Sequence, residues 1–150
     1  MISFQLRLLF IVIAVLFPVT PFADTGILFI VNRQNPVTSV SLRDVLDYYF
    51  KKNRQWPDDV PVRFIDRNSA SPERQAFLNR YLRKSSSDVD LYWFGQKLHT
   101  GDSVPIQVGS DSMVVQLVKS FRGGIGYISA SAPINDKLIK IIKITGMTQE

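Results

Sequence analysis

The sequence predicts an α/β domain with a mainly parallel sheet flanked by helices. Short apolar runs typical of buried strands alternate with segments whose apolar residues recur at helical spacing, and turn-forming residues separate them. Such alternation favours parallel pairing, because a helix can carry the chain back across the sheet between two strands. The length of 150 residues, with 21% charged and 45% hydrophobic residues, is that of one folded domain and excludes disorder.

A short N-terminal segment is expected to be removed from this domain. Arg7 precedes ten uninterrupted apolar residues, Leu8–Phe17, and Pro18–Ala23 then ends in a small residue. This is the order of a secretory signal peptide, and such a run is about half of the roughly 20 residues that span a bilayer. We therefore predict cleavage after Ala23, an exported domain over residues 24–150 and a periplasmic location. The alternative is an uncleaved N-terminal anchor.

The first half of the domain is expected to form a strand, a helix and a second strand. Gly26–Val31 is a short apolar run that predicts a buried strand, and Asn32–Val40 has the composition of a loop. From Ser41 the apolar residues recur at helical spacing, so we expect a helix that ends near Lys51–Lys52. Val62–Asp66 alternates and predicts the next strand.

The second half repeats this alternation. Ser71-Pro72-Glu73 is a strong helix start, with a capping hydroxyl, proline at the first position and an acid in the first turn. Two more helices are expected over Asp88–Leu98 and from Gly109-Ser110 to Gly123-Gly124. Strands are expected at Val104–Val108, Ile125–Ser129 and Leu138–Ile144.

The composition removes several kinds of chemistry. With no cysteine and one histidine, the chain has no disulfides, thiolate metal sites or multi-histidine metal sites. It has no nucleophile elbow, no Ser/His/Asp order and no phosphate loop of the nucleotide-binding kind. We therefore expect no enzyme, no cofactor and no metal. The net charge of +5 is spread among acidic residues, which does not indicate a nucleic-acid partner.

The segment Asp66–Arg74 (DRNSASPER) has the densest set of candidate binding groups. It follows a predicted strand and begins a helix, where free backbone N–H groups and a partial positive charge favour an anion. The flanking side chains are two hydroxyls (Ser69, Ser71), one amide (Asn68) and two guanidinium groups (Arg67, Arg74). Because guanidinium groups match the forked geometry of oxyanions, these residues predict an oxyanion site.

Other interpretations of these residues remain open. A capping serine between solvated arginines explains the same pattern, while Pro72 removes one donor and Glu73 adds a negative charge. In the later segment GGIGYIS, Gly124 and Gly126 either let a backbone approach a ligand or serve only to end a helix and turn the chain.

Three stretches, in this order and spacing, resemble the substrate-binding proteins of phosphate ABC transporters, which have the type 2 periplasmic-binding fold. They are residues 35–56 (NPVTSVSLRDVLDYYFKKNRQW), 60–82 (VPVRFIDRNSASPERQAFLNRYL) and 104–129 (VPIQVGSDSMVVQLVKSFRGGIGYIS). The resemblance implies that Arg67 and Ser71 take the places of the family's phosphate-binding arginine and serine. Pro72 and Glu73 replace the family's glycine and threonine, and the family is about twice as long, which implies a single-lobe form.

Two functions follow from this resemblance. The first is an exported, non-catalytic protein that binds an oxyanion, inorganic phosphate before others, for an ABC permease or a membrane sensor. The second is an interaction module that keeps the fold without a small ligand and docks on a membrane or envelope partner. The first requires that the donors of residues 69–74 converge on a hollow. A corner filled by the protein's own carboxylate, or one that faces open water with its guanidinium groups apart, would contradict the binding function and leave only the architecture.

Overall fold

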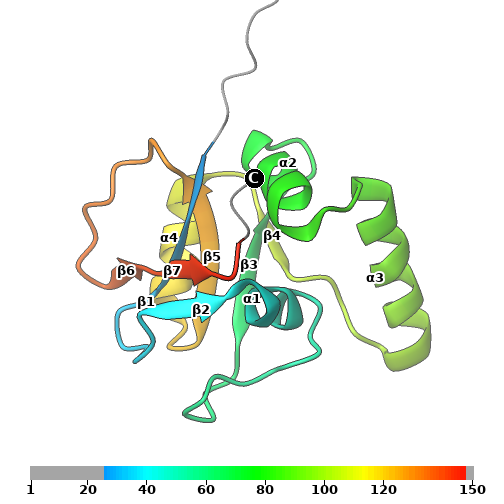
Figure 1. The fold of residues 1–150 in the computed structure, drawn as a ribbon, viewed down its shortest axis with the longest axis horizontal. Helices are drawn as coiled ribbons and strands as arrows, with labels where there is room; N and C mark the ends of the chain where they lie inside the picture. Colours follow the sequence, from blue (N-terminus) through cyan, green and yellow to red (C-terminus); the bar gives the residue numbers. More distant parts are fainter. Residues whose placement is uncertain (1–25, 148–150) are drawn as a thin grey trace, which may run out of the picture.

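The computed structural model describes residues 26–147 of the chain (Figure 1). The predicted signal peptide, residues 1–23, lies outside the described residues. Among residues 26–147, no helix has both the length and the apolar character needed to cross a bilayer.

A five-stranded sheet forms the centre of the domain, in the order β4-β3-β5-β1-β6. Its strands are β1 (Ile27–Asn32), β3 (Arg63–Arg67), β4 (Ile106–Val108), β5 (Gly124–Ser129) and β6 (Ile139–Ile141). Strand β3 is parallel to both β4 and β5, whereas β1 is antiparallel to its neighbours β5 and β6. All strands except β1 thus run in one direction, which confirms the predicted mostly parallel α/β sheet.

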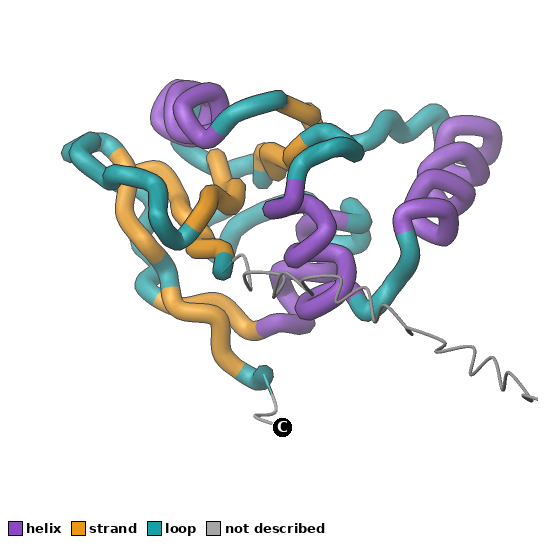
Figure 2. Tube along the Cα trace, turned by 90° about the horizontal axis from the view of Figure 1, so that it is seen from above, coloured by secondary structure: helices purple, strands orange, loops and turns teal. Residues whose placement is uncertain are grey.

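Helices cover both faces of this sheet (Figures 1 and 2). One face is covered by helix α1 (Leu42–Tyr49) and by a continuous helical segment, which consists of α2 (Pro72–Ala76) and the π-helical η1 (Phe77–Leu82). These helices pack on Phe29 and Tyr127 of the sheet. On the other face, helix α4 (Asp111–Ser120) packs on Ile30 and Ile65. Successive side chains of a strand, such as Phe29 and Ile30, thus point to opposite faces, and both faces are buried. Helix α3 (Ser86–Thr100) stands at one end of the molecule.

The C-terminal segment differs from its prediction. The expected single strand Leu138–Ile144 is two short strands, β6 and β7 (Lys143–Thr145), which belong to different sheets. Strand β7 pairs in parallel with β2 (Ser39–Ser41), inside a region that was expected to be mainly loop. Between the two strands, Ile142 is buried and its N–H still donates to Phe29 O of β1 at 3.0 Å, and the next residue, Lys143, begins the pairing with β2.

Local capping sets where the helices begin and end. Ser41, Ser71, Ser85 and Ser110 each accept a hydrogen bond from a backbone N–H in the first turn of the helix that follows. The helix that starts at Ser71 widens into a π-helix and ends at Arg83, which adopts the left-handed conformation at φ 51°. The helix predicted over Asp88–Leu98 begins earlier, because Ser85 and Asp88 form a reciprocal capping box.

Candidate functional site

Two helix starts meet at the carboxyl edge of the sheet. Strands β3 and β4 are adjacent and parallel, and each leads into a helix whose first residue follows a capping serine, Ser71 for α2 and Ser110 for α4. The carboxyl ends of parallel strands lie at one edge, which is where open α/β sheets bind their ligands. Arg67, the last residue of β3, lies between the two helix starts.

The Arg67 guanidinium contacts both helices. Its Nη1 donates to the carboxylate of Asp111, in the first turn of α4, and its Nη2 lies 3.2 Å from Oε2 of Glu73, in the first turn of α2. Nη2 also donates to the Gly109 carbonyl at 3.3 Å. The Arg67 side chain is 6% exposed, and its Nε has no hydrogen-bond partner among residues 26–147. Buried donors are rarely left unpaired, so Nε is an open hydrogen-bonding position in the site.

A second buried arginine lies behind the first. Arg74 Nη1 donates to the carboxylate of Asp66, whose side chain is fully buried. The hydroxyls of Tyr127 and Tyr49 also donate to Asp66, the latter at 3.1 Å, and so does Arg67 N at 2.8 Å. Asp66 therefore has four donors, which fix the end of β3 to α1, α2 and β5.

The network shifts the ionisation of its members. Burial, followed by the negative charge of Asp66, raises the pKa of both Tyr49 and Tyr127 far above the ordinary value. Burial alone would lower the pKa of Arg74, but the combined interactions with Asp66, Tyr49, Tyr127 and Asp90 outweigh it, so the pKa of Arg74 is raised. These tyrosines are thus fixed as neutral hydrogen-bond donors to Asp66.

The formal charges at this corner nearly cancel. Arg67 and Arg74 face Asp66, Glu73 and Asp111, and the amino ends of α2 and α4 add a partial positive charge. The protein's own carboxylates therefore occupy the positions beside the guanidinium groups that an oxyanion would take. This is the arrangement expected to count against an oxyanion, which could bind here only by displacing one of these carboxylates. Glu73 Oε2 is the least satisfied of them, because it is buried and accepts no hydrogen bond.

The structure brings some of the predicted site residues together and separates others. Arg67, Ser71 and Arg74 are buried and adjacent, and Ser71 Oγ accepts from Arg74 N at 3.0 Å. Asn68 and Ser69 are exposed beside them. Ser71 acts here as a cap, so its hydroxyl already has one partner.

Gly124 and Gly126 lie on β5, in register with Arg63 and Ile65 of β3, and the structure gives them a packing role. Gly124 is level with Arg63 at the far end of β3, about 13 Å from Arg67 at the usual rise per strand residue. A Cβ on Gly124 would lie 2.6 Å from Val118 O, and one on Gly126 would lie 2.7 Å from Val114 Cγ1. Their lack of a side chain allows α4 to pack against β5.

Sequence reasoning missed Asp111, Tyr49 and Tyr127. The sequence contained a signal for Asp111, because Gly109-Ser110-Asp111 follows a predicted strand just as Asn68–Ser71 does. Neighbouring parallel strands end at the same edge of a sheet, so the two segments come together there. Asp111 also lines a hollow of about 390 Å³ at the start of α4, together with Asp136. No group of three metal-ligating side chains lies within residues 26–147.

No family profile and no curated protein matches the chain by sequence. Solved structures do match. An ABC-type phosphate transport receptor from Vibrio cholerae is 21% identical with a TM-score of 0.61, over 79% of this chain and 46% of that one. PstS from Borrelia burgdorferi is 17% identical with a TM-score of 0.63, over 83% and 49%.

A third match, from Clostridium perfringens, was solved with bound phosphate and is assigned to the phosphate ABC transporter substrate-binding proteins. It is 26% identical with a TM-score of 0.60, over 82% of this chain and 46% of that one. The chain thus spans just under half the length of these receptors. Its fold is that of one lobe of a periplasmic binding protein, which confirms the resemblance inferred from residues 35–129.

Proposed function

We propose that this protein is an exported, non-catalytic binding protein for an oxyanion, with inorganic phosphate as the first candidate. Its structural neighbours are phosphate receptors of ABC transporters, and the same class of partner, an ABC permease or a membrane sensor, is proposed for this chain. A periplasmic location follows from the predicted signal peptide. The proposed ligand site is the corner formed by Arg67, Asn68, Ser69, Ser71 and Arg74.

One observation carries this proposal. Arg67 is buried where the starts of α2 and α4 meet, and its Nε has no partner within the described part of the chain. An oxyanion that replaced Glu73 would gain charge-assisted hydrogen bonds from Arg67. It would break no hydrogen bond of Glu73 Oε2, because that atom makes none. Glu73 therefore acts as an internal competitor that lowers the affinity for the anion.

The second candidate, an interaction module without a small ligand, also has an observation in its favour. Asp66, Glu73 and Asp111 already neutralise both arginines. A ligand must displace at least one of these carboxylates, and a single lobe leaves that ligand open to water, where its ionic contacts are weaker than in a closed cleft. In this function the corner only stabilises the fold, and a protein partner binds elsewhere.

Calorimetric titration of the purified protein with phosphate, sulfate and acetate distinguishes the two functions. The proposal predicts heat and a thermal shift with phosphate, both lost in Arg67→Met, whose folding is checked by circular dichroism. If no anion gives heat or a shift, the oxyanion function is wrong and the interaction module remains. A protein partner that binds Arg67→Met as strongly as it binds the native chain would support that second function.

A further inference from the structure

Helix α3 presents an apolar stripe to solvent. Leu91, Phe94 and Leu98 are 71%, 62% and 67% exposed, and their spacing places them on one face of the helix. The opposite face buries Val89 and Trp93 against the rest of the domain. Contiguous exposed apolar side chains of this size are typical of an interaction surface.

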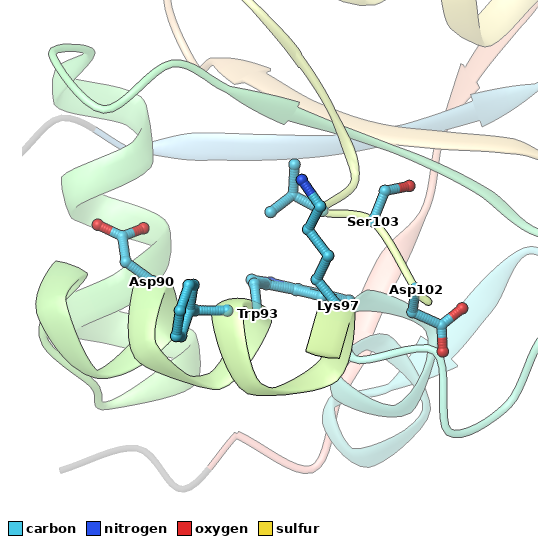
Figure 3. A pocket seen from close by; sticks show the side chains of 7 residues that line it. Asp90, Trp93, Lys97, Asp102 and Ser103 are labelled. Atoms are coloured by element: carbon cyan, nitrogen blue, oxygen red, sulfur yellow. The ribbon is translucent and has the colours of Figure 1, made fainter. Parts of the chain in front are cut away.

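The apolar surface continues beside the helix. A groove of about 350 Å³ lies between α3 and the loop that leads into β4, with Trp93 and Lys97 on the helix side and Ser103 on the loop side (Figure 3). Phe94 and Val104 contribute to its apolar lining. Val104 is 47% exposed, and Ile106 at the start of the edge strand β4 is 43% exposed. The surface therefore extends from the helix stripe towards the edge of the sheet.

Two opposite charges flank the stripe on the same side. Asp90 and Lys97 are seven residues apart, two helical turns, and both line the groove (Figure 3). Lys97 is exposed, and Asp90, 68% exposed, lies 3.7 Å from Arg74. When two copies of this helix lie antiparallel, Asp90 of each copy faces Lys97 of the other. The side of the helix that carries these two charges is therefore complementary in charge to the same side of a second copy.

Gly95 fits this arrangement. It lies in the middle of α3 beside the stripe, and a Cβ there would meet no other part of residues 26–147 within 4 Å. Glycine lowers helix stability relative to alanine, and the packing of this domain does not require it. A residue without a side chain at this position lets a second helix approach the stripe closely.

We propose that two copies of this chain associate through antiparallel α3 helices, about a two-fold axis that passes near Trp93 and Phe94. Leu91, Phe94 and Leu98 of both copies form the seam, and two Asp90–Lys97 pairs flank it. The 15 residues of α3 span about 22 Å, so the contact lies at the small end of specific interfaces, about 1,000 Å². The dimer is therefore expected to dissociate on dilution. This inference does not depend on oxyanion binding.

Analytical ultracentrifugation of the purified protein, from about 1 to about 500 µM, tests the proposal. The native chain should change from monomer to dimer over this range. Lys97→Asp places like charges opposite Asp90 and should weaken the dimer by about tenfold or more, and the double variant Asp90→Lys/Lys97→Asp should restore it. Lys52→Asp, the same change at an exposed lysine after α1, should have no effect.

Three results would overturn the proposal. The first is a native chain that stays monomeric at every concentration, which would leave the stripe for a different partner. The second is a dimer that neither Lys97→Asp nor Leu91→Ser/Phe94→Ser weakens, which would place the interface elsewhere. The third is a double charge variant that is folded by circular dichroism and does not recover the native dissociation constant.

Discussion

At the scale of single residues, the buried ion pair between Arg74 and Asp66 holds the candidate site to the sheet. Both side chains are at most 1% exposed. Arg74→Met should lower the free energy of unfolding by about 3–5 kcal/mol, because it leaves the Asp66 charge buried without its cation. Urea denaturation measures this change. Arg54→Met, which removes the exposed pair with Asp102, is the control and should have a far smaller effect.

The tyrosines that donate to Asp66 predict how stability depends on alkaline pH. Because the pKa of Tyr49 and of Tyr127 is raised in the folded protein, the folded state keeps both protons while the unfolded chain loses them above about pH 10. Their stabilisation is complete below that pH. Above it, the free energy of unfolding should fall by about 1.4 kcal/mol per pH unit for each tyrosine.

Tyrosine absorbance near 295 nm, followed with far-ultraviolet circular dichroism, tests this dependence. Tyr49 and Tyr127 should ionise only as the protein unfolds, and Tyr127→Phe should remove one group from that step. Ionisation of all five tyrosines before any loss of helical signal would contradict the assignment.

At the scale of elements, the contact between α4 and β5 depends on the glycines of GGIGYIS. Gly126→Ala should lower the free energy of unfolding by about 1–3 kcal/mol, because the added Cβ would lie 2.7 Å from Val114 Cγ1. Thermal and urea unfolding measure it. At Gly109 an added Cβ would meet Asn68 Nδ2 at 3.5 Å, an ordinary contact, so Gly109→Ala is the matched control. Equal stability of the two variants would refute the packing role.

Local sequence was sufficient for most elements. Helix starts were predictable because capping is a local interaction, as at Ser71 and Ser110. The C-terminal strand was not divided correctly, since the pairing of β6 with β1 and of β7 with β2 depends on contacts about 100 residues apart. Periodicity alone also cannot distinguish an α-helix from the π-helical stretch Phe77–Leu82.

At the scale of the whole molecule, the residues near Arg67 account for the arginines of the candidate site better than for its electrostatics. The segment Asp66–Arg74 supplies both buried arginines. Asp111, 44 residues beyond Arg67, and Tyr127 reach the same corner only because β3 lies between β4 and β5. Strand order is a property of the complete fold, so the extra carboxylate and the tyrosine donors could not be assigned from the residues near Arg67.

The competition between Glu73 and an oxyanion for Arg67 is the central claim at this scale, and phosphate titration of Glu73→Gln tests it most directly. Removing this carboxylate takes one negative charge from the site, so phosphate affinity should rise by about tenfold over the native chain. The control is Asp59→Asn, which should leave the phosphate affinity unchanged. It removes an exposed carboxylate, and asparagine tolerates the positive φ of this position. Equal affinity of Glu73→Gln and the native chain, or no phosphate heat in either, would contradict the account.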